Sequence, residues 1–179
     1  MILKFIAVKT ASVENQFESA YVTCRVMIGD EVNNANAIMV QNTSNVDAYI
    51  RASIVVNWMD EDGNVRGIAP VKAIDENGGD YAFTINHTAW EQDANTGFYY
   101  YKTEVKPNDT TAELLSNITV NGNKPDGYEL SVEVIAEAIQ ADGVTDDTQT
   151  PAVQDAWFNP LSDGGRAILN AWGIAPFGN

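Results

Sequence analysis

The chain has 179 residues, of which 45% are hydrophobic and 20% charged, and this balance predicts one globular domain over residues 1–179. Ten Lys and Arg residues stand against 25 Asp and Glu residues, which gives a formal net charge of −15. A field of that sign repels nucleic acid and anionic membrane surfaces, so we expect neither as a partner.

Two further features restrict the class of protein. No apolar run reaches the roughly 18 residues that a membrane span needs, and residues 1–8 are too short for the apolar core and cleavage site of a signal peptide. The single cysteine, Cys24, lies in an alternating apolar set, and we expect it to be a small buried side chain. An intrachain disulfide is excluded because there is no second cysteine.

The first segment of the chain is apolar and has no obvious hairpin partner before Phe17. An unpaired apolar strand is an aggregation hazard, and addition to the open sheet edge of a neighbouring copy would pair it. We therefore interpret residues 1–9 as a donor strand, with the alternative that residues 1–8 form the first strand of their own sandwich. The side chains expected to carry assembly are Met1, Ile2, Leu3, Phe5, Ile6 and Val8.

Residues 46–58 alternate between apolar and polar side chains, which predicts a long strand with one buried face. Arg51 and Asn57 are expected on the opposite face. The apolar set, expected inside, is Val46, Ala48, Ile50, Ala52, Ile54, Val56 and Trp58.

A polar turn follows this strand and contains the weak candidates for metal ligands. Asp60, Asp62 and Asn64 have the Asp-x-Asp-x-Asn spacing of calcium loops, which gather oxygen ligands. The glycine is misplaced for an EF-hand, however, and Val71 stands where the twelfth-position glutamate belongs. We interpret the segment as a hairpin turn, with Ca²⁺ binding as the alternative, and expect no other cofactor.

An aromatic run, Phe98 to Tyr101, suggests a platform for stacking sugars. On a strand, Phe98 and Tyr100 lie on one face and Tyr99 and Tyr101 on the other, so at most half of the run can form one platform. We interpret these residues as packing groups, with a glycan-binding module as the alternative.

Catalytic motifs are missing from the sequence. His87 is the only histidine, which excludes a two-histidine zinc motif, and it lies in a segment typical of a solvated loop. The chain also contains no Gly-x-Gly-x-x-Gly and no phosphate-binding loop. We expect a protein that is not an enzyme.

The rest of the chain predicts more strands and then a helical tail. Residues 81–85, 114–120 and 128–138 alternate as strands do, and for the last we prefer a strand to a helix despite its Glu and Ala content. In residues 150–173, Thr150 and Asp163 are candidate caps for two short helices that pack on the sheets. Many strands separated by turns predict an all-β fold, a β-sandwich with short C-terminal helices. The packing side chains expected in the tail are Trp157, Ile168, Leu169 and Trp172.

Several segments of the sequence resemble the TasA/camelysin-like secreted proteins of Gram-positive bacteria, over roughly residues 5–142. The segments, in chain order, are SVENQF (12–17), NTSNVDAYIR (42–51), IVVNW (54–58), DEDGN (60–64), FYYYK (98–102), VKPNDTT (105–111) and PDGYELSVEVIAEAIQA (125–141).

The resemblance implies a jelly-roll sandwich, secreted through a specialised signal peptidase, in its mature form. It also implies a location outside the cell or on its surface, and a fibre subunit of the biofilm matrix that donates its N-terminal strand to the next copy. Its partners would be copies of itself and other matrix or cell-surface components. Camelysin is described as a metalloprotease; a peptidase is the least favoured alternative here because the zinc motif is missing. We therefore expect a non-catalytic extracellular structural protein.

Overall fold

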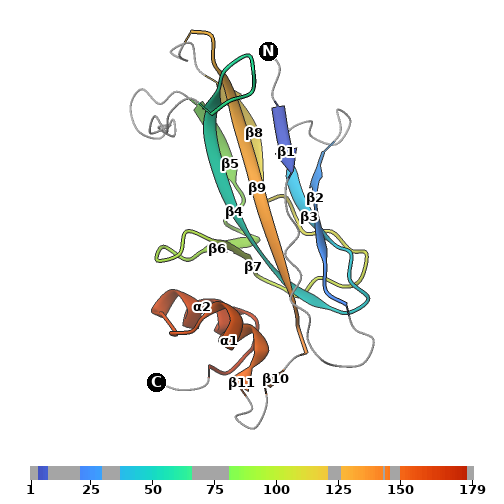
Figure 1. The fold of residues 1–179 in the computed structure, drawn as a ribbon. Helices are drawn as coiled ribbons and strands as arrows, with labels where there is room; N and C mark the ends of the chain where they lie inside the picture. Colours follow the sequence, from blue (N-terminus) through green and yellow to red (C-terminus); the bar gives the residue numbers. More distant parts are fainter. Residues whose placement is uncertain are drawn as a thin grey trace.

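The computed structural model describes residues 4–7, 21–29, 37–65, 81–120, 126–142, 144–145 and 150–176. Within these residues the fold is mostly β, and two sheets face each other with two short helices at one end (Figure 1). The first sheet has the order β1 (Lys4–Ala7), β9 (Glu129–Gln140), β4 (Ala48–Met59), β7 (Tyr99–Tyr101), β6 (Trp90–Gln92). The second has the order β2 (Cys24–Ile28), β3 (Ile38–Asn42), β8 (Leu115–Val120), β5 (Tyr81–Ile85). The all-β prediction is confirmed.

The centre of the first sheet is the long antiparallel pair β4–β9, paired without interruption from Ala48 with Gln140 to Met59 with Glu129. β9 is therefore a strand, as its alternation predicted, and its Glu and Ala content does not make it a helix. Tertiary pairing outweighs helix propensity here because one face of the segment is continuously apolar.

The main core lies between the two sheets. On β4, the buried residues Ala48, Ile50, Ala52 and Trp58 confirm the predicted inner face, while Ile54 and Val56 pack against the same core but stay half-buried. Val40 and Leu115 close the core from the second sheet. Cys24 is also buried there, as predicted, with 2% of its surface exposed.

The two helices, α1 (Ala152–Trp157) and α2 (Asp163–Ala171), cover the outer face of the first sheet at one end (Figure 1). The four predicted packing side chains all belong to this contact: Trp157, Ile168 and Leu169 are buried, and Trp172 stacks on Tyr49 with ring centroids 4.1 Å apart.

The predicted helix starts need two corrections. Thr150 lies in a short hairpin of β10 (Val144–Thr145) and β11 (Thr150–Pro151), and α1 begins after Pro151 without a side-chain cap. Ser162, not Asp163, caps α2, because its hydroxyl oxygen accepts from the amide of Gly165 at 2.9 Å. Gly173, with φ of 75°, follows the helix end as predicted.

Candidate assembly edge

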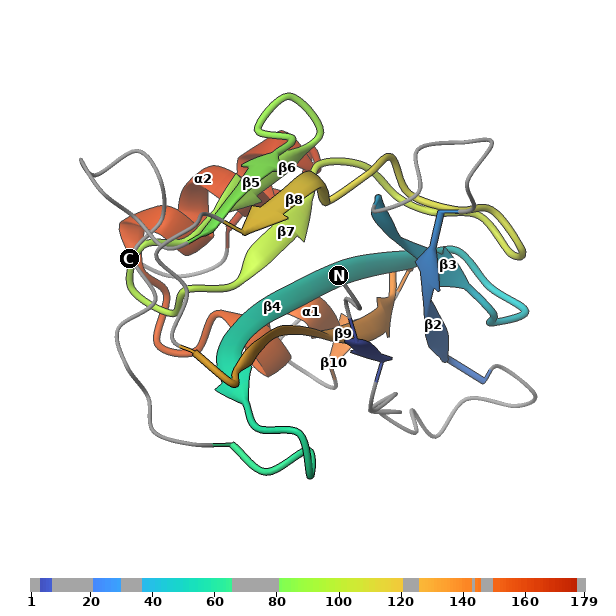
Figure 2. The ribbon, with the colours of Figure 1, turned by 90° about the horizontal axis from the view of Figure 1, so that it is seen from above.

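The N-terminal strand β1 forms the edge of the first sheet and pairs in parallel with β9 (Figure 2). Lys4 pairs with Ser131, Phe5 with Val132, Ile6 with Glu133 and Ala7 with Val134. Of the predicted assembly residues, Phe5 and Ile6 thus lie in this strand. Met1, Ile2, Leu3 and Val8 lie outside the described residues.

The acceptor strand β9 is much longer than β1. β9 pairs with β4 over all of its 12 residues, whereas on its other side only residues 131–134 pair with β1 within the described chain. β2 of the second sheet lies close to β9 along this same side of the sandwich (Figure 2). The buried side chains of Val132 and Val134 make this part of β9 a core-forming surface.

Two of the other described sheet edges, β6 and β5, are less suited to adding a strand. β6 has three residues and ends at a turn, and the pairing of β5 with β8 shifts register between Ala82 and Thr84. Short and irregular edges are how β-proteins discourage pairing with other chains. β2 has five residues in regular pairing with β3.

The candidate calcium residues lie at the tip of the hairpin after β4. One carboxylate oxygen of Asp60 accepts from the backbone amides of Asp62, at 3.0 Å, and Asn64, at 2.8 Å. Gly63 takes the positive φ of 81° that the turn requires. These are the hydrogen bonds of a tight turn, and within the described residues no group of three or more His, Cys, Asp or Glu is placed to hold a metal ion.

The aromatic run splits as its strand position predicted. Tyr99 and Tyr101 pack toward the main core, while Phe98 and the fully buried Tyr100 pack under the helices. Between them and α1, the guanidinium of Arg51 lies 4.2 Å from the Phe98 ring centre and 4.7 Å from that of Trp157. The aromatic side chains pack in the main core and under the helices, and Tyr100 is fully buried, so its ring is not accessible to a sugar.

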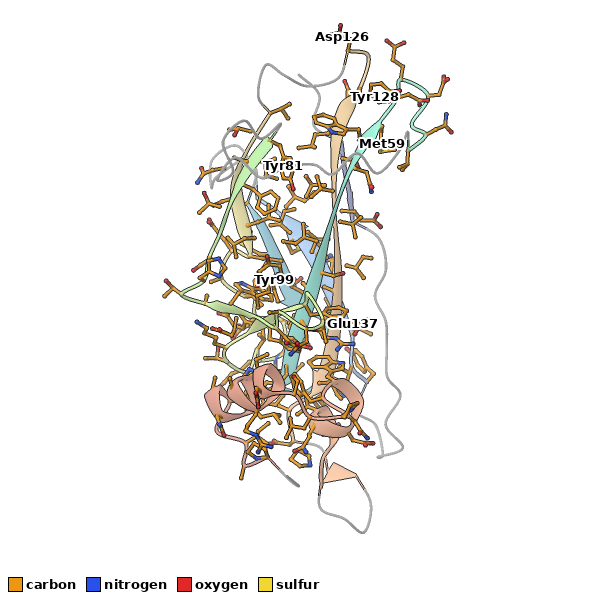
Figure 3. All side chains as sticks on the ribbon, turned by 90° about the vertical axis from the view of Figure 1, so that its left-hand side faces the viewer. Met59, Tyr81, Tyr99, Asp126, Tyr128 and Glu137 are labelled. Carbon is orange, nitrogen blue, oxygen red and sulfur yellow. The ribbon has the colours of Figure 1, made fainter. Side chains whose placement is uncertain are left out.

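An ion pair beneath the helices had no signal in the sequence. Arg51 Nη2 lies 2.6 Å from a carboxylate oxygen of Glu137, and Figure 3 shows Glu137 near the helical end, far from Met59 and Tyr128. The two residues stand opposite each other on β4 and β9. Only the register of the two strands brings them together, so spacing along the chain could not reveal them.

Burial raises the pKa of several groups without creating a reactive one. Burial, helped by the charge of Glu137, raises the pKa of the Cys24 thiol to about 12, which keeps it protonated and unreactive at neutral pH. Burial, and then the hydrogen bond that Tyr49 donates to Glu104, raise the pKa of Tyr49. His87 is exposed in a turn, as predicted.

Comparison with protein-family models, with curated proteins and with solved structures found no match to this chain. Among the described residues no helix is both long and apolar enough to cross a membrane. A function must therefore be inferred from the sequence and from the geometry of the β1–β9 edge.

Proposed function

We propose that this protein is a non-catalytic extracellular structural subunit that associates with copies of itself by exchange of its N-terminal strand. The observation that carries the proposal is the edge position of β1, a four-residue strand that fills part of one side of the 12-residue strand β9. Strand addition of this kind gains main-chain hydrogen bonds and buries a reactive sheet edge.

The length of chain next to β1 also supports exchange. Residues 8–23 separate β1 from β2, and an extended segment of that length spans about 50 Å. β1 of one copy therefore has enough connecting chain to reach β9 of a neighbour. Whether β1 pairs with β9 of its own chain or with β9 of a neighbour, it forms the same strand pairing. The two arrangements therefore differ little in their contacts.

The resemblance to TasA/camelysin-like proteins is the second support, and it adds the finer parts of the proposal. These are a jelly-roll version of the sandwich, secretion, a place in a biofilm matrix or on a cell surface, and other matrix components as further partners. The chain changes sheet at each connection from β3 to β6 and again from β7 to β9. Such crossing is typical of Greek-key and jelly-roll sandwiches.

A reversible lock on β1 tests the exchange. Ile6 and Glu133 are paired neighbours, and Cα atoms of adjacent strands are about 5 Å apart, within the range of a disulfide. We expect the double variant Ile6→Cys with Glu133→Cys to form no fibres in negative-stain electron microscopy when oxidised, and to form them when reduced. The two single-cysteine variants are the controls, and a non-reducing gel separates intrachain from interchain disulfides.

Two results would count against the proposal. Equal fibre formation by the oxidised and reduced double variant would exclude strand exchange as the assembly route. A wild-type protein that stays monomeric at high concentration, by light scattering and by microscopy, would exclude the polymer itself.

A further inference from the structure

Asp-Gly pairs are positions where a protein chain can modify itself, because glycine has no side chain to hinder attack by its nitrogen on the preceding carboxyl group. The sequence contains four such pairs: Asp62-Gly63, Asp126-Gly127, Asp142-Gly143 and Asp163-Gly164. The structure describes both residues of three of them, since Gly143 lies outside the described residues. These three pairs differ in how firmly the surrounding chain holds them.

The pair Asp126-Gly127 forms the turn that leads into β9, and both residues are exposed. Figure 3 shows Asp126 at the tip of the molecule, beyond Tyr128. Gly127 has φ of 79°, and a Cβ atom added to it would meet nothing within 4 Å. No described residue accepts a hydrogen bond from the amide of Gly127. The carboxyl group and the nitrogen that it would react with are therefore held by little besides the chain itself.

The pair Asp62-Gly63 lies in a turn that is held by hydrogen bonds. The amide of Gly63 donates to the carbonyl oxygen of Asp60 at 2.9 Å, and the amide of Asp62 donates to a carboxylate oxygen of Asp60 at 3.0 Å. The nitrogen of Gly63 must give up its hydrogen bond before it can attack the carboxyl group of Asp62. This turn is exposed too, so its hydrogen bonds and not its burial distinguish it from Asp126-Gly127.

The pair Asp163-Gly164 lies in the first turn of α2, where the helix fixes the backbone torsions. Gly164 also packs tightly against the buried Asp93, because a Cβ atom added to Gly164 would lie 2.5 Å from Asp93 Oδ1. The nitrogen of Gly164 therefore cannot turn toward the carboxyl group of Asp163 while the helix is intact.

We propose that Asp126 is a site of spontaneous isomerisation to isoaspartate. The nitrogen of Gly127 attacks the side-chain carboxyl carbon of Asp126, a C–N bond forms, and the amide proton leaves with the carboxyl hydroxyl as water. The product is a five-membered succinimide ring. Water then adds to the backbone carbonyl carbon of Asp126 and breaks its bond to the nitrogen, which leaves isoaspartate. One water is released and one is consumed, so no other reactant is needed.

The modification lengthens the main chain by one carbon atom just before the first residue of β9. That residue, Glu129, forms the last pair of the β4–β9 ladder with Met59. The exposed product is a substrate for carboxyl methyltransferases that recognise isoaspartate, which gives the class of enzyme that fits this turn. The site does not depend on the proposed function.

Incubation of the full chain at neutral pH in water enriched in oxygen-18 tests the proposal, because opening of the ring places a labelled oxygen on the modified residue. Tandem mass spectrometry then assigns the label to a residue. We expect label to enter Asp126 about fivefold faster than Asp62, the factor that corresponds to one net hydrogen bond. Asp163 should be the slowest of the three. In urea, where no fold restrains the chain, the three should react at similar rates.

Asp126→Glu is the matched control, because it keeps the charge and would have to close a less favourable six-membered ring. It should abolish labelling at position 126 and leave Asp62 unchanged. Asp60→Ala removes the carboxylate that holds the other turn and should raise the rate at Asp62 toward that of Asp126.

An isoaspartate-specific carboxyl methyltransferase gives an independent measurement, and it should methylate aged wild-type protein more than aged Asp126→Glu. Label that enters Asp62 of the folded wild type as fast as Asp126 would overturn the proposal. Label that enters Asp126 only in urea would overturn it as well.

Discussion

The β4–β9 strand pair is covered differently at its two ends. Near the helices both faces are buried: Ile50 faces the main core, and on the outer face Tyr49 and Ile139 are 2% and 1% exposed. Toward the other end the outer face is less covered: Val55 is 37% exposed and Glu129 is exposed, although Ser131 on the same face is buried. The same alternating pattern therefore occurs where one face of the strand pair is buried and where both faces are. The helices cover the part of the outer face that carries large and aromatic side chains.

The largest expected effect comes from removing the centre of the second layer. Trp157 packs against Tyr100, Trp172 and the guanidinium of Arg51, so we expect Trp157→Ala to lower the free energy of unfolding by about 3–5 kcal/mol. Val55→Ala, at the exposed position on the same sheet face, should cost less than about 0.5 kcal/mol. Urea denaturation measures both. Similar small losses would mean that the helices are not a packed layer.

The inner face offers a comparison along a single strand. Ile50 is fully buried and Ile54 half-buried, so we expect Ile50→Ala to cost about 2–5 kcal/mol and Ile54→Ala about half as much. The measurement is again denaturation at equilibrium, with equal m-values as the check that the unfolded states match. A larger loss at Ile54 than at Ile50 would contradict the burial described for β4.

The ion pair Arg51–Glu137 is less exposed to solvent than the ion pair Lys102–Glu91. We expect the first pair to contribute more to the free energy of unfolding. Glu137→Gln leaves the guanidinium of Arg51 between two rings without its counter-charge, and we expect a loss of about 1–3 kcal/mol. Glu91→Gln removes the exposed pair with Lys102 at 3.2 Å and should cost less than about 0.5 kcal/mol. Added salt should reduce the second effect more than the first; equal losses would mean that the helices do not shield the Arg51 pair.

The smallest expected effect is the pH dependence of stability that comes from Cys24 in the main core. Burial raises the pKa of Cys24 from its ordinary value of about 9 to about 12, so between these pH values the unfolded thiol ionises while the folded one keeps its proton. Stability from this source is complete below about pH 9 and falls as the pH rises further. Between pH 8 and pH 10 the wild type should lose about 1 kcal/mol more than Cys24→Ala. Identical pH profiles would show that the thiol ionises as easily in the folded state.

Much of this protein follows from its sequence, because alternation acts locally. The period-two patterns of residues 46–58 and 128–138 predict the strands β4 and β9 and the side chains that line the core, since successive side chains of a strand point to opposite faces. The split of the aromatic run and the hairpin turn at Asp60 follow from equally local rules. The apolar character of residues 1–9 predicts a strand but says nothing about its acceptor.

Tertiary structure decided what local rules cannot reach. The parallel placement of β1 on β9 and the pairing of Arg51 with Glu137 both depend on strand register. Register is set by the summed packing of both faces, and its partners lie as far apart in the sequence as residues 4 and 131. The burial of the outer face under the helices also could not be predicted locally. In the sequence Tyr49 occupies an ordinary outward position of its strand, and only the C-terminal helices bury it.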